Sequence, residues 1–368
     1  MKVLVIGNST RSVVCSAKRA GYTVYSLDRF HDVDMQECSD KSGFLGNTPD
    51  EKILELSASF GKFDAVVLGP GFEKLKFKNA LNNNPKVLEE VNDKLNIARK
   101  FVSMDLPHPD TELLADAKGE KFPLMIKPIS GSGGMLNTMV KNEAELEELK
   151  SRKNVSNFIA QEFIEGIPCS TSLISTGDDA VVVALNEQLI GIPWLTRLPF
   201  AYCGNITPFH TEFRDEMIKY AKQIALEFGL VGSNGVDFIL TEKGVVVIEI
   251  NPRFQGSIDT VELSCGINIF DAHVRSFKGE LPEAGKYVRF AGKAIIYANE
   301  NLVVNEKLHE GLIECMRMNR AADVPEAGRI IQPDEPVATM IGIGKTRKSV
   351  MQKLFRYAHN IGGKFKAQ

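Results

Sequence analysis

Residues 235–257 read GVDFILTEKGVVVIEINPRFQGS. Two runs of apolar, mostly β-branched residues, 236–240 and 245–250, flank a polar turn at 241–244. Runs of this kind on either side of a short polar turn are typical of a β-hairpin. The sequence therefore predicts two paired antiparallel strands, which carry more charge than such apolar strands usually do.

Polar side chains of the predicted hairpin converge on one face. Successive strand residues point to opposite faces, so Glu249 and Asn251 share a face about 7 Å apart, and Pro252 ends the strand. A connection that behaves as five residues places Asp237 opposite Glu249, whereas a four-residue connection turns Asp237 to the other face. We favour the first register.

The residue types on that face indicate a cation site. Two carboxylates and a carboxamide repel one another or stay unsatisfied unless a cation lies among them, and oxygen ligands favour a hard ion such as Mg²⁺. Arg253, two residues past Asn251, adds a fork of donors suited to phosphate or carboxylate. The alternative is a solvated hairpin with ordinary surface acids, and the hairpin alone does not separate the two interpretations.

The composition is that of an ordinary globular protein. The chain has 368 residues, of which 43% are hydrophobic and 25% charged, enough for two or three domains with their own cores. A net charge of −3 and an isoelectric point near 6.1 give no electrostatic footprint for nucleic acid or an anionic membrane. Neither is an expected partner.

The cysteines and the apolar runs bear on location. The cysteines are scattered, with no CxxC and no zinc-like spacing, so we expect reduced, mostly buried thiols. The opening MKVLVIGNS is too short an apolar run for a signal peptide, and no segment reaches about 18 apolar residues. A cytoplasmic protein is expected. The cysteines are Cys15, Cys38, Cys169, Cys203, Cys265 and Cys315.

The first hundred residues alternate strand and helix patterns, which predicts a parallel α/β domain. The turn GNSTRS after the first strand lacks the GxGxxG spacing, so a nicotinamide dinucleotide site is not supported. The predicted strands are 2–6, 22–27 and 65–68, and the predicted helices are 12–20 and 51–60.

The middle of the chain predicts an α+β domain. The strand FPLMIKP, residues 122–128, leads into the loop ISGSGG, whose backbone N–H groups suit close approach to phosphate. Lys127, in that apolar strand, needs an anionic partner. Residues 186–210 are rich in turn formers and are expected to be an irregular loop, which either covers a site or packs on the surface. Further strands are expected at 137–140, 157–164, 171–175 and 180–185, and helices at 92–101, 143–150, 214–228, 268–278 and 348–358, with a strand-rich stretch from 286.

Four motifs occur together in order: IKPISGSGG at 126–134, QEFIEG at 161–166, GVDFIL at 235–240 and VIEINPR at 247–253. With them, the chain resembles the ATP-grasp superfamily. Within it the chain is most similar to carboxylate-amine ligases related to biotin carboxylase and carbamoyl phosphate synthetase, including uncharacterised archaeal relatives.

The resemblance covers roughly residues 1–280 and implies an α/β plus α+β architecture. It implies a parallel α/β pre-ATP-grasp domain at 1–100, a central nucleotide-binding subdomain at 101–185 and a metal-binding subdomain at 186–280. Residues 281–368 are similar to the C-terminal β-rich domain of biotin carboxylase.

The resemblance also assigns roles to residues. It implies that Lys94 and Lys127 contact the ATP phosphates, although Lys94 could instead lie on a solvated helix face. It implies a phosphate-covering loop at Ser130, Gly131, Ser132, Gly133 and Gly134, an adenine hinge at Glu162, Phe163 and Ile164, and Mg²⁺ or Mn²⁺ ligands at Asp237, Glu249 and Asn251. Arg253 would hold the γ-phosphate or an anionic intermediate, and Arg253 and Lys127 would be the catalytic residues.

Two positions depart from the family pattern. Many relatives bind the ribose hydroxyls with an acid about seven residues after the hinge glutamate, and Cys169 stands there, so either Glu165 substitutes or the ribose is held less directly. Gly235 stands where D-alanine ligases carry an arginine, which argues against a dipeptide ligase of that type. The sequence ATM at 338–340 takes the place of a biotinylated MKM turn, so self-biotinylation is not supported.

The function implied is ATP-dependent joining of a carboxylate to an amine, with the amine expected to be amino-acid-like. The acid would be phosphorylated to an acyl phosphate and the amine would displace phosphate, which leaves ADP and phosphate as products. Alternatives are bicarbonate activation of the biotin carboxylase kind and an ATP-binding module without catalysis. Relatives are often dimers, so a homodimer is compatible with the resemblance. Trp194, Arg197 and the loop FAYCGNITPF either line the acceptor pocket or pack on the surface.

Overall fold

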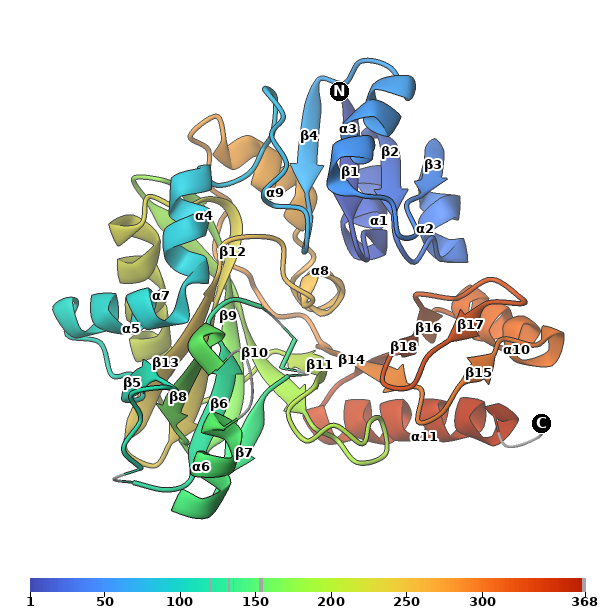
Figure 1. The fold of residues 1–368 in the computed structure, drawn as a ribbon. Coiled ribbons are helices and arrows are strands. Elements are labelled where there is room, and N and C mark those ends of the chain that lie inside the picture. The colour runs from blue at the N-terminus through green and yellow to red at the C-terminus, as the bar shows by residue number, and fades with distance from the viewer. Residues whose placement is uncertain (120, 132, 135, 152–154, 366–368) are drawn as a thin grey trace.

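The structure is a computed structural model that describes residues 1–119, 121–131, 133–134, 136–151 and 155–365 (Figure 1). Its N-terminal part is a four-stranded parallel sheet in the order β3-β2-β1-β4. Residues 3–6 of β1 are fully buried, which is why this strand is a continuous apolar run. The predicted parallel α/β domain is confirmed. The elements are β1 (Lys2–Gly7), α1 (Arg11–Arg19), β2 (Thr23–Asp28), α2 (Val33–Cys38), β3 (Lys41–Phe44), α3 (Asp50–Ser59) and β4 (Ala65–Leu68).

Two helices lead from this sheet to the rest of the molecule. The sequence predicted one helix at 92–101, but α4 (Pro85–Asn92) and α5 (Lys94–Ser103) form instead. Asp93 separates them, because its carboxylate accepts hydrogen bonds from the N–H groups of Leu95 and Asn96 and so caps α5.

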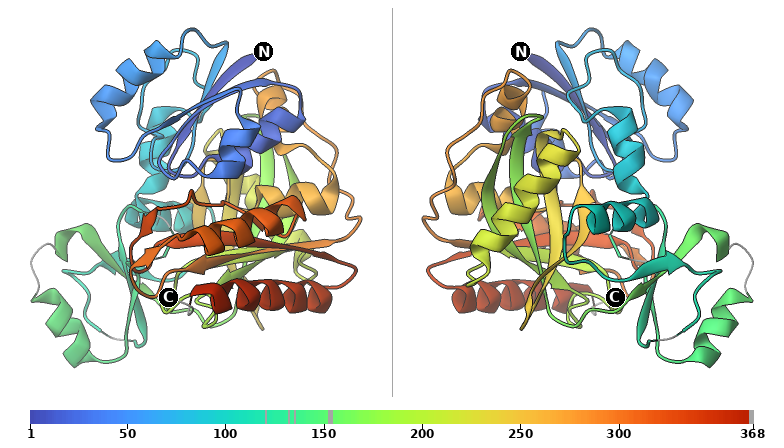
Figure 2. Two further views of the ribbon diagram at one scale, coloured as in Figure 1. Left: turned by 90° about the vertical axis from the view of Figure 1, so that its right-hand side faces the viewer. Right: turned by 90° about the vertical axis from the view of Figure 1, so that its left-hand side faces the viewer.

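A second, antiparallel sheet of four strands follows, in the order β5-β8-β6-β7. It stands apart from the N-terminal sheet in all three views of the fold (Figures 1 and 2). Its elements are β5 (Thr111–Leu113), β6 (Leu124–Pro128), β7 (Thr138–Val140), α6 (Glu143–Lys150), a 3-10 turn (Val155–Asn157) and β8 (Phe158–Glu162).

The centre of the molecule is an eight-stranded antiparallel sheet in the order β13-β12-β9-β10-β11-β14-β18-β16. Helix α7 packs against one face of β9, β10 and β12, and α8 and α9 lie on the other side of the sheet. The sheet is built from β9 (Ile167–Thr176), β10 (Ala180–Ile190), β11 (Tyr202–Thr207), β12 (Val231–Thr241), β13 (Gly244–Asn251), β14 (Phe290–Tyr297), β16 (Ala321–Ala322) and β18 (Pro336–Gly344), and the helices are α7 (Arg214–Glu227), α8 (Ile258–Cys265) and α9 (Ile269–Ser276).

One segment of this sheet contradicts the expectation from sequence. Residues 186–210 were expected to be irregular, but β10 extends to Ile190 and residues 202–207 form β11. Strand β11 pairs with β10 on one side and with β14 on the other. Since β14 begins more than eighty residues later, the partner that orders this turn-rich segment is not visible in the local sequence.

The C-terminal strands extend the central sheet. Strands β14, β18 and β16 continue it beyond β11, and β15 (Leu302–Val303) pairs with β17 (Ile330–Ile331) beside it. Helix α10 (Glu306–Arg317) was not predicted, and α11 (Arg347–Phe365) is longer than the predicted helix at 348–358. The expected β-rich C-terminal part is present, whereas the boundaries 1–100, 101–185, 186–280 and 281–368 stay predictions.

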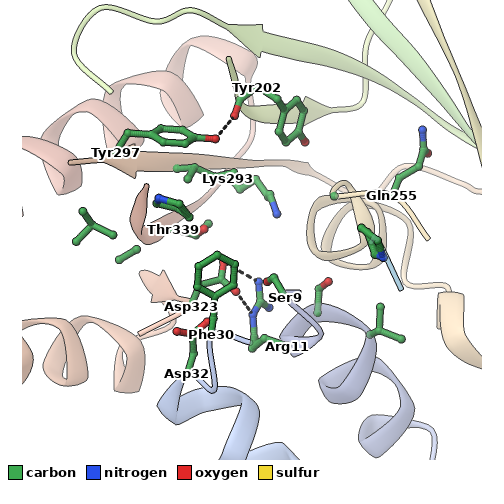
Figure 3. A pocket seen from close by; sticks show the side chains of 18 of the residues that line it. Ser9, Arg11, Phe30, Asp32, Tyr202, Gln255, Lys293, Tyr297, Asp323 and Thr339 are labelled. Atoms are coloured by element: carbon green, nitrogen blue, oxygen red, sulfur yellow. Dashed lines mark hydrogen bonds and ion pairs between the residues drawn. The ribbon is translucent and has the colours of Figure 1, made fainter. Parts of the chain in front are cut away.

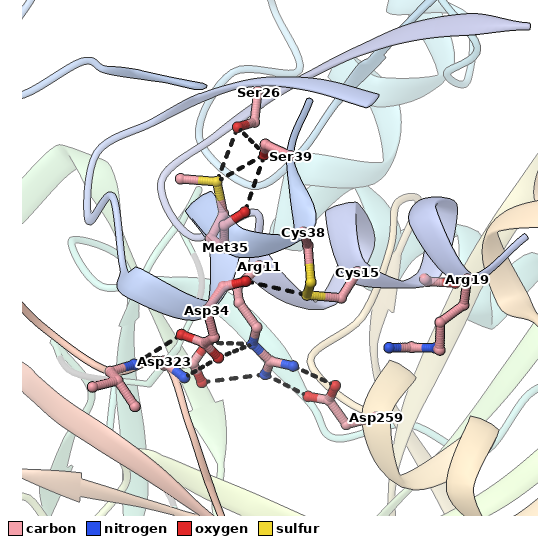
Figure 4. The surroundings of a disulfide bond; sticks show 12 residues. Arg11, Cys15, Arg19, Ser26, Asp34, Met35, Cys38, Ser39, Asp259 and Asp323 are labelled. Atoms are coloured by element: carbon pink, nitrogen blue, oxygen red, sulfur yellow. Dashed lines mark hydrogen bonds and ion pairs between the residues drawn. A yellow bond between two sulfur atoms is a disulfide. The ribbon is translucent and has the colours of Figure 1, made fainter. Parts of the chain in front are cut away.

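The N-terminal sheet, the loop after β13 and the C-terminal strands meet around a cavity of about 250 Å³ (Figure 3). Below it, the buried guanidinium of Arg11 on α1 joins all three parts (Figure 4). It makes two hydrogen bonds to Asp259 on α8, at 2.6 and 2.7 Å, and two to Asp323 after β16, at 2.8 and 3.3 Å. Arg11 therefore connects the three parts of the molecule through ion pairs.

A disulfide joins α1 to α2 close to Arg11 (Figure 4). Cys15 and Cys38 are bonded, so the expectation that all the cysteines are reduced is wrong for this pair. The two helices pack side by side and bring the Cα atoms within 5.1 Å, although 23 positions separate them in sequence. Cys169, Cys203 and Cys265 are buried thiols, as expected. Within the described residues, no helix is long and apolar enough to cross a membrane.

Candidate active site

The β12–β13 hairpin places Asp237 directly opposite Glu249, as predicted, but by an unexpected route. Near the turn the strands pair as a four-residue connection, with Leu240 opposite Val245 and Phe238 opposite Val247. Continued regularly, this register would set Asp237 opposite Ile248. A β-bulge makes Ile248 an extra residue and restores the pairing of Asp237 with Glu249.

Asp237 lies at the centre of a polar group. Its two carboxylate oxygens accept hydrogen bonds of 3.0 Å, one from the amide of Asn251 and one from the amide of Gln188. Burial, together with the neighbouring charge of Glu249, raises the pKa of Asp237 to about 7. Two adjacent carboxylates in such a setting are destabilised unless a cation joins them.

The donor set fits a hard divalent ion. Asn251 uses its amide N–H on Asp237, so its carbonyl oxygen remains for another partner, and Glu249 is 27% exposed. No group of three or more His, Cys, Asp or Glu side chains clusters for a metal in the described part of the chain. The combination present is two carboxylates and one carboxamide, which is all oxygen and leaves room for phosphate and water.

Two lysines flank the carboxylates. Lys127 on β6 donates a 2.7 Å hydrogen bond to Gln161, and burial lowers its pKa to about 8. Lys94 donates a 2.8 Å hydrogen bond to the carbonyl of Gly131 and lies 3.6 Å from Glu249. Its side chain is only 15% exposed, so it does not lie on a solvated helix face. Lys94 therefore connects the glycine loop to Glu249.

A cavity of about 370 Å³ adjoins these groups and lies between the small and the large sheet. Its walls bring together predicted residues from all four motifs: Lys127, Gly133, Gly134, Glu162, Phe163, Ile164, Glu165, Asp237 and Glu249. A neighbouring cavity of about 540 Å³ contains Arg253, whose guanidinium lies 3.3 Å from Glu73, and also Ser130 and Gly131. Ser132 lies outside the described residues.

Cys169 does not take part in either cavity. It is fully buried in the core under α7, and burial raises the pKa of its thiol to about 12. Its neighbour Pro168 lines the larger sheet's side of the cavity, because adjacent strand residues face opposite ways. Glu165 is exposed and lines the cavity. Glu165 therefore faces the cavity that the hinge residues line, and Cys169 does not.

Trp194 and Arg197 pack on the surface and line none of the cavities described above. Trp194 stacks edge-on against Phe355 of α11, with ring centroids 5.4 Å apart. Arg197 is half exposed and pairs with Asp334 at 2.7 Å. The loop that contains them is nonetheless relevant, because Phe200 and Tyr202 line the 370 Å³ cavity.

Two residues of the site were not predicted from the sequence. Gln188 holds Asp237 from β10, and no local pattern marks it, because the contact depends on the order of the strands. Gln161 holds Lys127 and precedes the hinge directly in QEFIEG, so that motif could have revealed it. Gly235 is explained by packing, since Gln255 fills the space where any side chain would start.

Residues 91–257 match the family model of the ATP-grasp domain. This part of the chain is therefore similar to an ATP-grasp domain. An uncharacterised protein of Methanocaldococcus jannaschii is 25% identical over 379 aligned residues, which cover 96% of this chain and 91% of that protein. A formate-dependent phosphoribosylglycinamide formyltransferase of Prochlorococcus marinus is 24% identical over 81% of this chain and 82% of its own length. The large chain of carbamoyl phosphate synthase from Clostridium perfringens matches 46% of this chain at 26% identity, and the match covers 16% of that protein.

Solved structures share the fold. The biotin carboxylase domain of 2-oxoglutarate carboxylase from Hydrogenobacter thermophilus, a dimer with MgADP and bicarbonate, gives a TM-score of 0.71 at 19% identity, with 92% of this chain and 85% of that one covered. The L-amino acid ligase of Bacillus licheniformis gives 0.70 at 18% identity, with 98% and 97% covered. The predicted resemblance to biotin carboxylase, carbamoyl phosphate synthetase and an uncharacterised archaeal branch is confirmed, as is the ATP-grasp fold with its flanking parts.

Proposed function

We propose that this ATP-grasp chain is a ligase that joins a carboxylate to an amine through an acyl phosphate and releases ADP and phosphate. The observation that supports it most strongly is the pairing of Asp237 with Glu249 and Asn251 beside Lys127, in a cavity that the hinge residues 162–164 also line. Relatives named as a formyltransferase and an amino acid ligase support the same class of reaction.

In this proposal the described residues divide the binding of ATP among them. Asp237, Glu249 and Asn251 would hold Mg²⁺, or Mn²⁺ in its place, which would supply positive charge against the phosphates. Lys94, Lys127 and the loop from Ser130 to Gly134 bind the phosphates, with Lys127 already positioned by Gln161. Backbone groups of Phe163 and Ile164 and the side chain of Glu162 read the adenine edge, and Glu165 contacts the ribose.

The proposed chemistry needs no protein nucleophile. An oxygen of the substrate carboxylate attacks the γ-phosphorus, the bond to the bridging oxygen breaks, and ADP leaves. The amine nitrogen then attacks the acyl carbon, phosphate leaves with the bonding electrons, and the nitrogen loses a proton to solvent. The guanidinium of Arg253, which Glu73 orients at 3.3 Å, stabilises the anionic tetrahedral intermediate.

The test is ADP release with pooled carboxylic acids and amines in the presence of Mg²⁺. We expect release to require one acid and one amine, and Glu249→Gln to lower the rate at least a hundredfold. Glu242→Gln, in the turn of the same hairpin, makes the same change of charge away from the cavity and is expected to keep the wild-type rate. A Glu249→Gln variant as fast as wild type would refute the metal assignment.

A second candidate is activation of bicarbonate, supported by the similarity to a biotin carboxylase domain bound to bicarbonate. ADP release that depends on bicarbonate and needs no amine would establish it. The sequence-based argument for a module without catalysis rested on Cys169, which lies in the core and away from the nucleotide cavity. A cytoplasmic location, where ATP is available, and a homodimer stay parts of the proposal.

A further inference from the structure

A second cavity, the 250 Å³ one at the junction of the three parts, adjoins the nucleotide cavity (Figure 3). Tyr202 lines both cavities. The backbone carbonyl of Tyr202 accepts a 2.8 Å hydrogen bond from the hydroxyl of Tyr297, which lines the 250 Å³ cavity as well. A molecule bound there would therefore lie next to the phosphate end of the proposed nucleotide site. The inference that follows rests on the ligase function proposed above.

Most charges around this cavity are already neutralised within the protein. Arg11 is fully used, since Asp259 and Asp323 each accept two of its hydrogen bonds. Asp34 accepts hydrogen bonds from the backbone N–H groups of Asp323 and Val324. None of these groups needs a ligand.

Asp32 is the exception among the carboxylates. It is only 5% exposed and lines the cavity, and its one cationic partner is Arg329, which donates a single long hydrogen bond of 3.4 Å to one of its oxygens. Although Asp32 precedes α2, its side chain makes no capping hydrogen bond. Burial, followed by the neighbouring carboxylates Asp323, Asp28 and Asp34, raises the pKa of Asp32 well above its usual range. One long hydrogen bond from a guanidinium compensates a buried carboxylate only in part, so Asp32 can accept a second cationic donor from the cavity.

Lys293 on β14 is the matching exception among the cations. It is also 5% exposed, and Figure 3 shows its ammonium group pointing into the cavity. Its nearest carboxylate is that of Asp259, 3.7 Å away, which is beyond hydrogen-bond distance. Asp259 already accepts both hydrogen bonds of the Arg11 fork. The ammonium of Lys293 therefore remains available for an anion.

Apolar side chains line the cavity beside these two charged groups. Phe30, Ile295 and Val337 contribute to the walls, and the guanidinium of Arg329 stacks on the ring of Phe30 at 4.9 Å. The cavity is small and mostly apolar, and it holds the partly compensated carboxylate of Asp32 and the available ammonium of Lys293. It is therefore complementary to a small molecule that carries both charges.

We propose that the 250 Å³ cavity binds one of the two ligase substrates as a free amino acid, with the ammonium group on Asp32 and the carboxylate on Lys293. Its size restricts that substrate to a small molecule. A carboxylic acid without an amino group, or a phosphorylated sugar, pairs with Lys293 but offers no ammonium group to Asp32.

The test measures binding, without turnover, by calorimetry on the full chain with MgADP present. The probes are the standard L-amino acids, and then the N-acetyl and the carboxamide derivative of the tightest binder. We expect at least one amino acid to bind and both derivatives to bind at least tenfold more weakly. No binding by any amino acid, or equal binding of either derivative, would overturn the proposal.

Variants separate this site from the rest of the molecule. Asp32→Asn and Lys293→Met should each weaken amino acid binding at least tenfold while MgADP binding stays unchanged, which shows that the variant is folded. The melting temperature of Asp32→Asn should equal or exceed that of wild type, because a poorly compensated buried charge is removed. Asp334→Asn, on the surface beside Arg197, is the matched control and should bind as wild type does. Wild-type affinity in Asp32→Asn would contradict the assignment.

The two proposals fail in different ways. Amino acid binding without ADP release in any mixture would leave the cavity assignment standing and refute the ligase function. ADP release that proceeds with an acid and an amine, neither of them an amino acid, while no amino acid binds, would do the opposite.

Discussion

At the scale of single residues, the unusual feature is the presence of ionisable side chains that the protein compensates only in part. Asp237 receives two neutral amide donors and faces another carboxylate, while Lys127 is held by the neutral amide of Gln161. Their pKa values move toward each other, to about 7 and about 8, because burial disfavours both charges. Groups perturbed in this way in one cavity are typical of functional sites.

Replacing the lysine tests its role directly. Lys127→Met should raise the Kd for MgATP at least about tenfold, because a charge-assisted contact to phosphate is lost. Calorimetric titration of MgATP measures this. Lys121→Met, on a side chain that is 74% exposed nearby, should leave the Kd unchanged. Equal Kd values for the two variants would remove Lys127 from the nucleotide site.

For Cys169 we expect no effect on nucleotide affinity, in contrast to Lys127. Cys169→Ala should leave the Kd for MgATP within about twofold of wild type and lower the free energy of unfolding by about 1 kcal/mol, because only a core contact is lost. Urea unfolding and the same titration measure the two effects. A large loss of affinity would show that residue 169 reaches the ribose after all.

At the scale of elements, the hairpin shows how one irregularity creates a site. The alternation of its side chains is set by the pairing near the turn, and the bulge at Ile248 then rotates the end of β13 so that Glu249 faces Asp237. The sequence motif specifies the residue types, whereas the bulge brings Asp237 and Glu249 opposite each other.

The α1–α2 pair carries the second element-scale prediction. The Cys15–Cys38 disulfide closes a loop of 23 positions, so the double variant Cys15→Ala, Cys38→Ala should unfold with a free energy about 3 kcal/mol lower. Urea unfolding without reductant measures the difference. Dithiothreitol should bring wild type to the level of the variant and leave the variant unaffected. An unchanged wild-type midpoint in dithiothreitol would contradict the bond.

At the scale of the whole molecule, a few buried polar residues connect the N-terminal sheet to the central one. Arg11 binds Asp259 and Asp323, and Asn83 donates hydrogen bonds to Asn234 and to the carbonyl of Pro252 at the base of the hairpin. Contacts of this kind fix the N-terminal sheet against the strands that carry the proposed metal ligands.

His273 belongs to the same interface and makes it sensitive to pH. The ring accepts a 2.9 Å hydrogen bond from the N–H of Ser233 and lies 3.0 Å from the carbonyl of Leu81, and burial lowers its pKa to about 4. Since the unfolded chain binds a proton near pH 6.5, the stabilisation is complete above that pH and is lost as the pH falls toward 4, by about 3 kcal/mol. Urea unfolding between pH 7 and pH 4 should show a weaker pH dependence in His273→Gln than in wild type. Identical pH profiles would contradict this assignment.

The sequence predicted the local elements well because periodicity and turn chemistry are local. It found β4 and α6 to the residue and predicted the hairpin and the pairing of Asp237 with Glu249, although not the register near the turn. It missed what depends on distant partners: strand β11, which forms only between β10 and β14, the disulfide, and the position of Gln188 beside Asp237. The charges around the 250 Å³ cavity come from opposite ends of the chain, so no motif connects them.

The most direct test of the proposed ligase function follows one oxygen atom. The acid that supports ADP release is labelled with oxygen-18 in its carboxylate, and the released phosphate is analysed by mass spectrometry. Formation of an acyl phosphate transfers a carboxylate oxygen to phosphorus, so the predicted result is one labelled oxygen in each phosphate released. Unlabelled phosphate would mean that water attacks ATP, and it would contradict the proposed ligase.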